Sequence, residues 1–193
     1  MASRPTAKNV GRHVALLRGI NLGPTRSLPM KALAELCTAA GCREVQTYIQ
    51  SGNVVFSASA TVAARFPDTL AAAILRKFKM EVPVVTRTAE ELAEVVGHNP
   101  FQKKGIDPDW LHVVFLARAP TPGQVASLDP ARSPGDEFVV VGRDIYLHLP
   151  NGMARTKLTN QYLDSRLKTV STVRNWRTVR KLLEMAESME GAD

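Results

Sequence analysis

The sequence predicts an α+β protein made of two similar halves, each an antiparallel sheet with helices on one face. Segments with a two-residue hydrophobic period, typical of strands, alternate with segments of period 3.6, typical of helices. Their order, β-α-β-β-α-β plus a trailing helix, occurs twice along the 193 residues. Apolar residues make up 45% of the chain and Gly and Pro number only 12 each, which excludes a disordered or collagen-like protein.

The first half is expected at residues 13–97, after a disordered tail at 1–12. Ser27 is predicted to cap the first helix and Gly41 to end it, while Ser51-Gly52 predicts a tight hairpin turn. Pro67 is expected to kink the second helix or to delay its start. The predicted strands are 13–18, 45–50, 53–57 and 82–87, and the predicted helices are 28–40, 61–79 and a short one opened by a capping box from Thr88 to Glu91.

The second half is expected at residues 111–190, after a Pro/Gly/Lys-rich linker at 98–110. Gly142-Arg143 predicts a hairpin turn, and Asn175 is expected to cap the last helix. The predicted strands are 111–118, 137–142, 144–149 and 169–174, and the predicted helices are 121–128, 157–167 and a last one that buries Trp176, Val179, Leu183 and Ala186.

The two halves share details that favour an internal duplication. The fourth strand of each half ends at an arginine, Arg87 or Arg174, and a helix-capping residue, Thr88 or Asn175, follows at once. The β-α-β-β-α-β order is that of the ferredoxin-like arrangement. Right-handed crossovers would then place two helices on one face of a four-stranded antiparallel sheet in each half.

Several segments are specific enough to resemble a known family. These are RGINLG (18–23), TYIQSGNVVF (47–56), HNPF (98–101), YLHLPNGMARTKL (146–158) and RNWRTVRKL (174–182). They resemble the bacterial family catalogued as domain of unknown function 1697, over about residues 13–187. The resemblance implies a ferredoxin-like α/β fold and a bacterial origin, and it implies no activity, because the family has no established one.

Cationic and amide side chains gather in segments without acids. The formal net charge is +7, and segments 18–26, 50–57, 151–160 and 170–180 contain no Asp or Glu. Several of these segments lead from a strand into a helix N-terminus, a place that favours anions. This pattern predicts a site for a phosphate- or carboxylate-bearing ligand. The candidate residues are Arg18, Asn21, Ser51, Asn53, Asn151, Arg155, Lys157, Arg174 and Asn175, with Arg26 as a further cation.

Topology adds a condition to this hypothesis. The candidates of the first half follow its first two strands, and those of the second half follow its last two. They would share a cleft between the halves only if the halves were related by a pseudo-two-fold axis. The alternative is that the same residues cap helices and close turns.

Other function classes have less support in the sequence. An enzyme acting on a phosphorylated metabolite would use Lys157 or Ser51, yet the chain has no P-loop, GxGxxG or GxSxG motif. Binding of a nucleic-acid backbone fits the basic charge, but the stacking aromatics of an RNA recognition motif are missing. A structural or partner-binding role stays open, and oligomeric state is not predicted.

Cysteines and histidines indicate no metal or cofactor. Cys37 and Cys42 match neither a CxxC nor a zinc pattern, and buried thiols in a reducing cytoplasm are expected. The histidines, at 13, 98, 112 and 148, show no HExxH spacing. No apolar run approaches the roughly 18 residues of a membrane span, so no membrane partner is expected.

Overall fold

The computed structural model describes residues 10–23 and 27–189, and Lys103 only in its backbone. The described residues divide into two compact units, one formed by those up to Glu91 together with those from Leu182 onward, and the other by Leu92–Lys181. Each division point falls within a helix, whereas the sequence places the boundary at the 98–110 segment. Hydrophobic periodicity predicts that a helix follows the fourth strand of each half. It does not predict to which unit each residue of that helix belongs.

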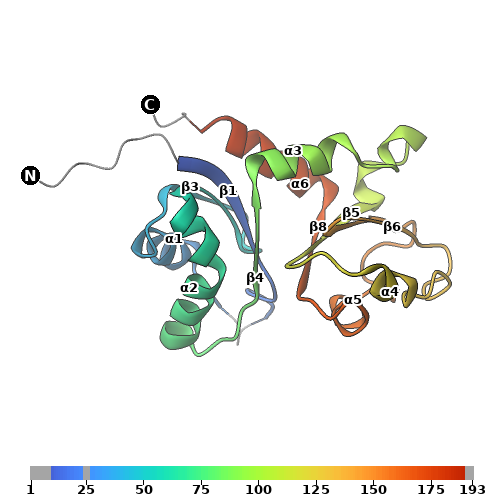
Figure 1. The fold of residues 1–193 in the computed structure, drawn as a ribbon, viewed down its shortest axis with the longest axis horizontal. Coiled ribbons are helices and arrows are strands. Elements are labelled where there is room, and N and C mark those ends of the chain that lie inside the picture. The colour runs from blue at the N-terminus through green and yellow to red at the C-terminus, as the bar shows by residue number, and fades with distance from the viewer. Residues whose placement is uncertain (1–9, 24–26, 190–193) are drawn as a thin grey trace, which may run out of the picture. The chain divides into compact units, whose positions relative to one another are not determined.

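The first unit holds a four-stranded sheet in the order β2-β3-β1-β4, with all neighbours antiparallel. Helices α1 and α2 cover one face of this sheet (Figure 1). The elements are β1 (Val10–Leu17), α1 (Met30–Ala39), β2 (Arg43–Tyr48), β3 (Asn53–Ser59), α2 (Ala60–Phe78), β4 (Val84–Thr88) and the start of α3 (Ala89–Gly97).

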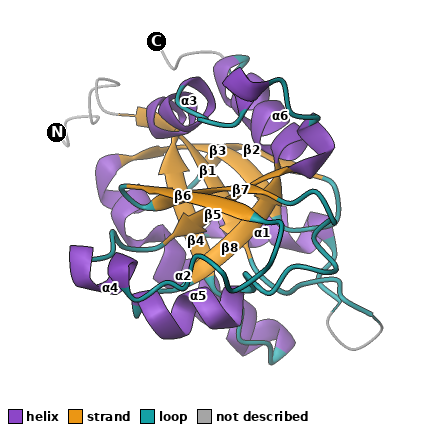
Figure 2. Ribbon diagram, turned by 90° about the vertical axis from the view of Figure 1, so that its right-hand side faces the viewer, coloured by secondary structure: helices purple, strands orange, loops and turns teal. Residues whose placement is uncertain are grey.

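The second unit repeats this order as β6-β7-β5-β8, again antiparallel throughout. Helices α4 and α5 pack on one face of its sheet (Figure 2). The elements are the 3₁₀ turns η1 (Gln102–Lys104) and η2 (Pro108–Trp110), β5 (Leu111–Leu116), α4 (Pro122–Ala126), β6 (Glu137–Val141), β7 (Asp144–His148), α5 (Asn160–Leu167), β8 (Ser171–Asn175) and α6 (Trp176–Glu187).

The strand registers support an internal duplication. Val14 of β1 pairs with Arg87, and Val113 of β5 pairs with Arg174, at the same point of each sheet. Both arginines are buried, and each donates from Nη1 to the carbonyl of the preceding residue at 2.8 Å. The histidine before each valine, at 13 or 112, lies opposite the residue that caps the next helix.

Two capping predictions are confirmed. Thr88 and Glu91 form the reciprocal capping box, with bonds of 2.9 and 3.1 Å. Asn175 accepts from the N–H of Arg177 at 2.9 Å.

Two predictions at the start of the chain are wrong. Strand β1 begins at Val10, because β3 continues to Ser59 and supplies partners for residues 10–12; residues 1–9 of the expected tail lie outside the described part. Ser27 does not cap α1, whose N-cap is Pro29 without a side-chain bond. The proline disfavours helical backbone at Leu28, and Leu28 N–H is held instead by Asn21.

Two helices also differ from expectation in detail. Helix α2 runs continuously from Ala60 with Pro67 inside it, capped by Ser59, so Pro67 does not delay its start. In α6, Leu182 is buried and Leu183 only half-buried, because the buried stripe runs through Trp176, Val179, Leu182 and Ala186.

The stripe on α6 gives a stability test. Val179 is fully buried, so Val179→Asp places an unpaired charge among apolar side chains and should lower the free energy of unfolding by roughly 3 kcal/mol or more. Urea denaturation measures this, with exposed Arg180→Asp as the control. A loss no larger for Val179→Asp than for the control would contradict the assignment of the buried face.

Candidate functional site

Two loops of the first unit lie side by side where β1 and β2 end. Leu17 N–H donates to the carbonyl of Gly52 at 2.8 Å, which joins the end of β1 to the β2–β3 turn. The Asn21 amide bridges the same two loops, because it donates to the carbonyls of Gln50 (2.7 Å) and Leu28 (3.1 Å) and accepts from Leu28 N–H (2.8 Å). The Asn21 side chain is therefore used to close this end of the sheet.

The Asn53 side chain likewise closes the turn between β2 and β3. Its side chain is fully buried, and it donates to the carbonyl of Tyr48 at 3.1 Å and to Oγ of Ser51 at 2.9 Å. Gly52 has a φ of +77°, and a Cβ there would lie 2.7 Å from the Cβ of Leu17. The sequence SGN is thus explained by turn geometry and tight packing.

These loops also contain strained backbone. Ile49 has a φ of +48°, a value that β-branched residues rarely adopt. Asn21, Gly19 and Gly23 have positive φ as well. The strain is held by the hydrogen bonds of Asn21 and Asn53, so these bonds serve the architecture.

The site residues predicted in the first half therefore lie close together, but their side-chain amides form the hydrogen bonds that hold these loops. Asn21, Ser51 and Asn53 meet at one end of the sheet, and Arg18 lies beside them, with its N–H donating to the carbonyl of Pro83 at 3.0 Å. Arg26 lies outside the described residues.

In the second unit, the loop after β7 is pinned to the loop before β6. Lys157 N–H donates to Oγ of Ser133 at 3.0 Å, and that hydroxyl donates to Asp136 at 2.6 Å. Thr156 and Leu158 are buried, whereas Arg155 and Lys157 are exposed. This alternation turns both cations to solvent.

The same region gathers two more cations around one aromatic ring. The Arg132 guanidinium lies 4.8 Å from the centre of the Tyr162 ring, and that of Arg166 lies 5.8 Å from it. The Tyr162 hydroxyl accepts from the N–H of Asp129 at 2.8 Å, which fixes the ring. We refer to the exposed set Arg132, Arg155, Lys157 and Arg166 as the basic surface.

Of the remaining candidates of the second half, Arg174 and Asn175 do not join this surface. Asn151 is exposed on the same loop as Arg155. Arg174 is buried and bonded to Thr172 and Val173, and burial lowers its pKa to about 10. Asn175 lies on β8, three strands from β6 and hence roughly 14 Å from it across the sheet. Arg174 and Asn175 serve the strand and the helix cap.

Tyr162, Arg132 and Arg166 carry no motif that distinguishes them in the sequence. The spacing of Tyr162 and Arg166, i and i+4 on one helix, is the signal that could have identified that pair. A second group without a motif joins Glu137, His148 and Lys104. Glu137 is 2.8 Å from His148 Nδ1 and 3.2 Å from Lys104 Nζ, and these two contacts lower the pKa of the Glu137 carboxyl.

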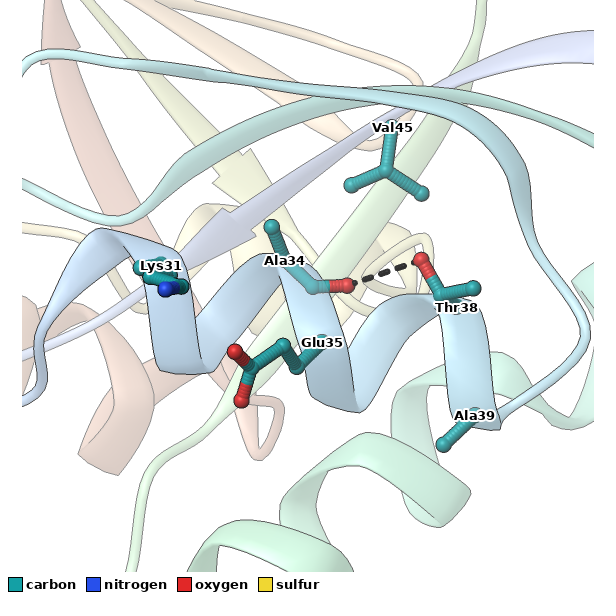
Figure 3. A pocket seen from close by; sticks show the side chains of 6 residues that line it. All are labelled: Lys31, Ala34, Glu35, Thr38, Ala39 and Val45. Atoms are coloured by element: carbon teal, nitrogen blue, oxygen red, sulfur yellow. Dashed lines mark hydrogen bonds between the residues drawn. The ribbon is translucent and has the colours of Figure 1, made fainter.

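A surface hollow of about 550 Å³ lies on α1 and is lined by Lys31, Ala34, Glu35, Thr38, Ala39 and Val45 (Figure 3). Thr38 Oγ1 is bonded back to the Ala34 carbonyl of its own helix. With one cation and one acid, this lining has no set of convergent polar groups.

Thiols and metal ligands offer little chemistry. Cys37 and Cys42 are free and buried, and burial raises the pKa of each thiol to about 12. Within residues 10–23 and 27–189, no three His, Cys, Asp or Glu side chains form a group that could hold a metal ion. No helix in the same residues is long and apolar enough to cross a membrane.

The structural duty of Asn53 can be tested by truncation. Asn53→Ala removes a fully buried side chain that donates to the Tyr48 carbonyl and to Ser51 Oγ, and should cost about 1–3 kcal/mol of unfolding free energy. Exposed Asn151→Ala is the matched control, expected within about 0.5 kcal/mol of wild type in urea denaturation. Equal stabilities of the two variants would return Asn53 to the list of ligand-binding candidates.

The buried histidines predict a pH dependence of stability. Burial lowers the pKa of His13 and of His112 below the ordinary value of 6.5. The unfolded chain therefore takes up protons at a higher pH than the folded chain, so stability present above about pH 6.5 is lost as the pH falls.

Unfolding free energies at about pH 7.5 and pH 5.5 measure this loss, which His112→Gln should reduce. The control is exposed Gln46→Asn, which removes no titrating group and is expected to keep the wild-type difference. An unchanged pH difference in His112→Gln would show that the buried ring is not its source.

Comparisons with known proteins agree with this architecture. A conserved bacterial protein from Streptococcus pneumoniae, SP0830, has a similar structure, with a TM-score of 0.70 over 93% of this chain and 99% of that one. The two sequences are 21% identical, so the likeness concerns the fold alone. No curated protein matches the sequence. The family described as "Protein of unknown function (DUF1697)" matches residues 10–146, and the chain belongs to this family.

Proposed function

We propose that this protein binds a phosphate-bearing anionic ligand at the basic surface of its second unit. The proposal rests on the exposure and the bonding of the Arg155 and Lys157 side chains. Both are exposed, and neither side chain has a hydrogen bond or ion pair within the described residues. Asn21, Asn53 and Arg174, by contrast, have buried or loop-closing bonds that leave them little freedom to change partner.

The spacing of the two cations suits one anionic group. The Cα atoms of Arg155 and Lys157 lie at most about 7 Å apart, and both side chains are exposed while Thr156 between them is buried. An anionic group bound between these two cations would offset their mutual repulsion. The bond from Lys157 N–H to Ser133 holds the loop in this form before any ligand arrives.

The chemistry of the surface favours phosphate over a neutral ligand. A guanidinium presents a fork of donors that matches phosphate oxygens, and an ammonium adds a point charge. Arg132 and Arg166, steadied against Tyr162, extend the positive surface. The neighbouring carboxylates of Asp129 and Asp136 accept from Ala131 N–H and Ser133 Oγ.

Binding fits these residues better than catalysis does. Lys157 Nζ has no hydrogen-bonded base within the described residues, and a reactive lysine needs such activation or desolvation. Ser51 accepts from the Asn53 amide as part of the turn. We also propose that each half is a ferredoxin-like unit, which its strand order and antiparallel pairing support, and that the protein works in the cytoplasm, where free thiols persist.

The test is a titration with inorganic pyrophosphate, followed by calorimetry and by amide NMR shifts. The double variant Arg155→Gln/Lys157→Gln should bind about tenfold more weakly, because two charge-assisted contacts are lost. Arg76→Gln, which removes an exposed cation from α2, is the matched control and should bind as wild type.

Salt and oligonucleotides then define the ligand class. Affinity for pyrophosphate should fall as salt rises, since the contacts are exposed. A single-stranded oligonucleotide that binds more tightly, with a steep salt dependence lost in the double variant, would point to a nucleic-acid backbone. Pyrophosphate and oligonucleotide binding that is absent, or is equal in the double variant and the wild type, would contradict the proposal.

A further inference from the structure

The outer strand of the second sheet has an apolar, regular edge. Strand β6 has the sequence EFVVV, without Lys, Pro or bulge, and it pairs with β7 in unbroken register over all five residues. Val139 and Val141 are 37% and 48% exposed, whereas Phe138 and Val140 pack toward the core on the other face. A strand of this kind at a sheet edge is a template for a further strand.

The equivalent edge of the first sheet is protected. Strand β2 has the sequence REVQTY, with exposed charges at Arg43 and Glu44. Its register against β3 shifts between Arg43 and Gln46, and Glu44 has a φ of +50°. Charges and bulges are the devices that keep an edge from pairing. Between these two equivalent strands, β6 is thus the more regular and the less charged edge.

The hydrogen-bond phase of the sheet identifies the groups on this edge. Leu116 N–H donates to the Arg143 carbonyl and Leu149 N–H to the Trp110 carbonyl, so the odd-numbered residues of this stretch bond toward β5. The even-numbered residues of β7 therefore bond toward β6, where their partners are residues 137, 139 and 141. The N–H and C=O groups of Phe138 and Val140 consequently point away from the sheet.

We propose that β6 binds the β6 strand of a second copy of this chain, antiparallel and about a two-fold axis at Val139. In this register Phe138 of one copy lies opposite Val140 of the other, and all four outward backbone groups of each copy form hydrogen bonds. The two Val139 side chains become a non-hydrogen-bonded pair, and each Val141 lies opposite the partner's Glu137. Four-stranded sheets would thus join into one eight-stranded sheet.

A second copy suits this edge because an identical strand matches it about a two-fold axis. The outward groups of Phe138 face those of the partner's Val140 and the reverse, and exposed Val139 meets its own copy, so both chains bury apolar surface at the same point. The charges at the strand ends do not decide the partner, because Glu137 is already bonded to His148 and Lys104 and Asp144 lies beside Arg143. Since the contact covers only five residues per copy, it belongs to the weak, concentration-dependent class of interfaces.

Sedimentation of the full chain from low micromolar to millimolar concentration tests the association. Wild type should show a reversible monomer–dimer equilibrium. Val139→Lys should remove the dimer, because it sets two ammonium groups opposite each other, while its unfolding midpoint stays near that of wild type, since Val139 is exposed. Gln46→Lys, the same charge on the edge of β2, should dimerise as wild type. A wild-type chain that is monomeric throughout, or a Val139→Lys dimer of unchanged affinity, would overturn the proposal.

A cross-link tests the register. In the proposed pairing the Cα atoms of the two residues 139 are about 4.5 Å apart, within the range that a disulfide bridges. Val139→Cys should therefore form a disulfide-linked dimer on mild oxidation, while the buried Cys37 and Cys42 stay reduced. Val141→Cys is the control, because residues 141 of the two copies would be roughly 14 Å apart. Cross-linking of Val141→Cys but not of Val139→Cys would overturn this register.

Discussion

The central strand of each sheet is the constraint on which the rest of this protein depends. Strand β1 pairs with β3 and β4, and β5 pairs with β7 and β8, so the backbone of both is hydrogen-bonded on two sides. Val14, Ala15, Leu16 and Leu17 are completely buried. Side chains that alternate between two buried faces have to be apolar or fully paired. Chemistry that involves solvent is therefore restricted to strand ends, loops and sheet edges.

Arg87 and Arg174 show how the two sheets meet this constraint in the same way. Each arginine is buried on a fourth strand and bonds to the carbonyl of the residue before it. Removal of a guanidinium from water is costly unless its donors find acceptors. The same arrangement occurs at the same register position of both sheets. It supports an internal duplication, because each half needs an arginine on its fourth strand, paired with a valine of the central strand and bonded to the carbonyl before it.

Much of the architecture could be predicted from the sequence, because hydrophobic period and turn residues are local. The Thr88 and Asn175 caps and the hairpin at Gly142-Arg143 depend on neighbours a few residues away. Ser27 is the instructive failure: it has the right residue type for a cap, but Asn21 holds Leu28 and the helix begins after Pro29. That contact spans seven residues and leaves no periodic signal.

The predicted site residues fall into two groups, the asparagines that close loops and the exposed cations, for a similar reason. An asparagine offers both donors and an acceptor over a short reach, so a loop can use all of them, as it does with Asn21, while Asn53 donates to two acceptors of its turn. A lysine or arginine offers donors only and carries its charge far from the backbone. A segment without acids can therefore arise in two ways. In the segments of Asn21 and Asn53 the amides close loops, whereas in the segment of Arg155 and Lys157 positive charge stays at the surface.

The two halves consequently differ where the shared fold permits it. The fold requires the buried strands, the arginine at the fourth strand and the cap after it, and these are kept in both halves. It does not require an exposed edge to be open or a loop to be basic. The first half closes its edge with a bulge and uses its loop amides internally, whereas the second exposes a regular edge and a cluster of cations. The two halves thus share a buried framework and differ in their loops and in the edges β2 and β6.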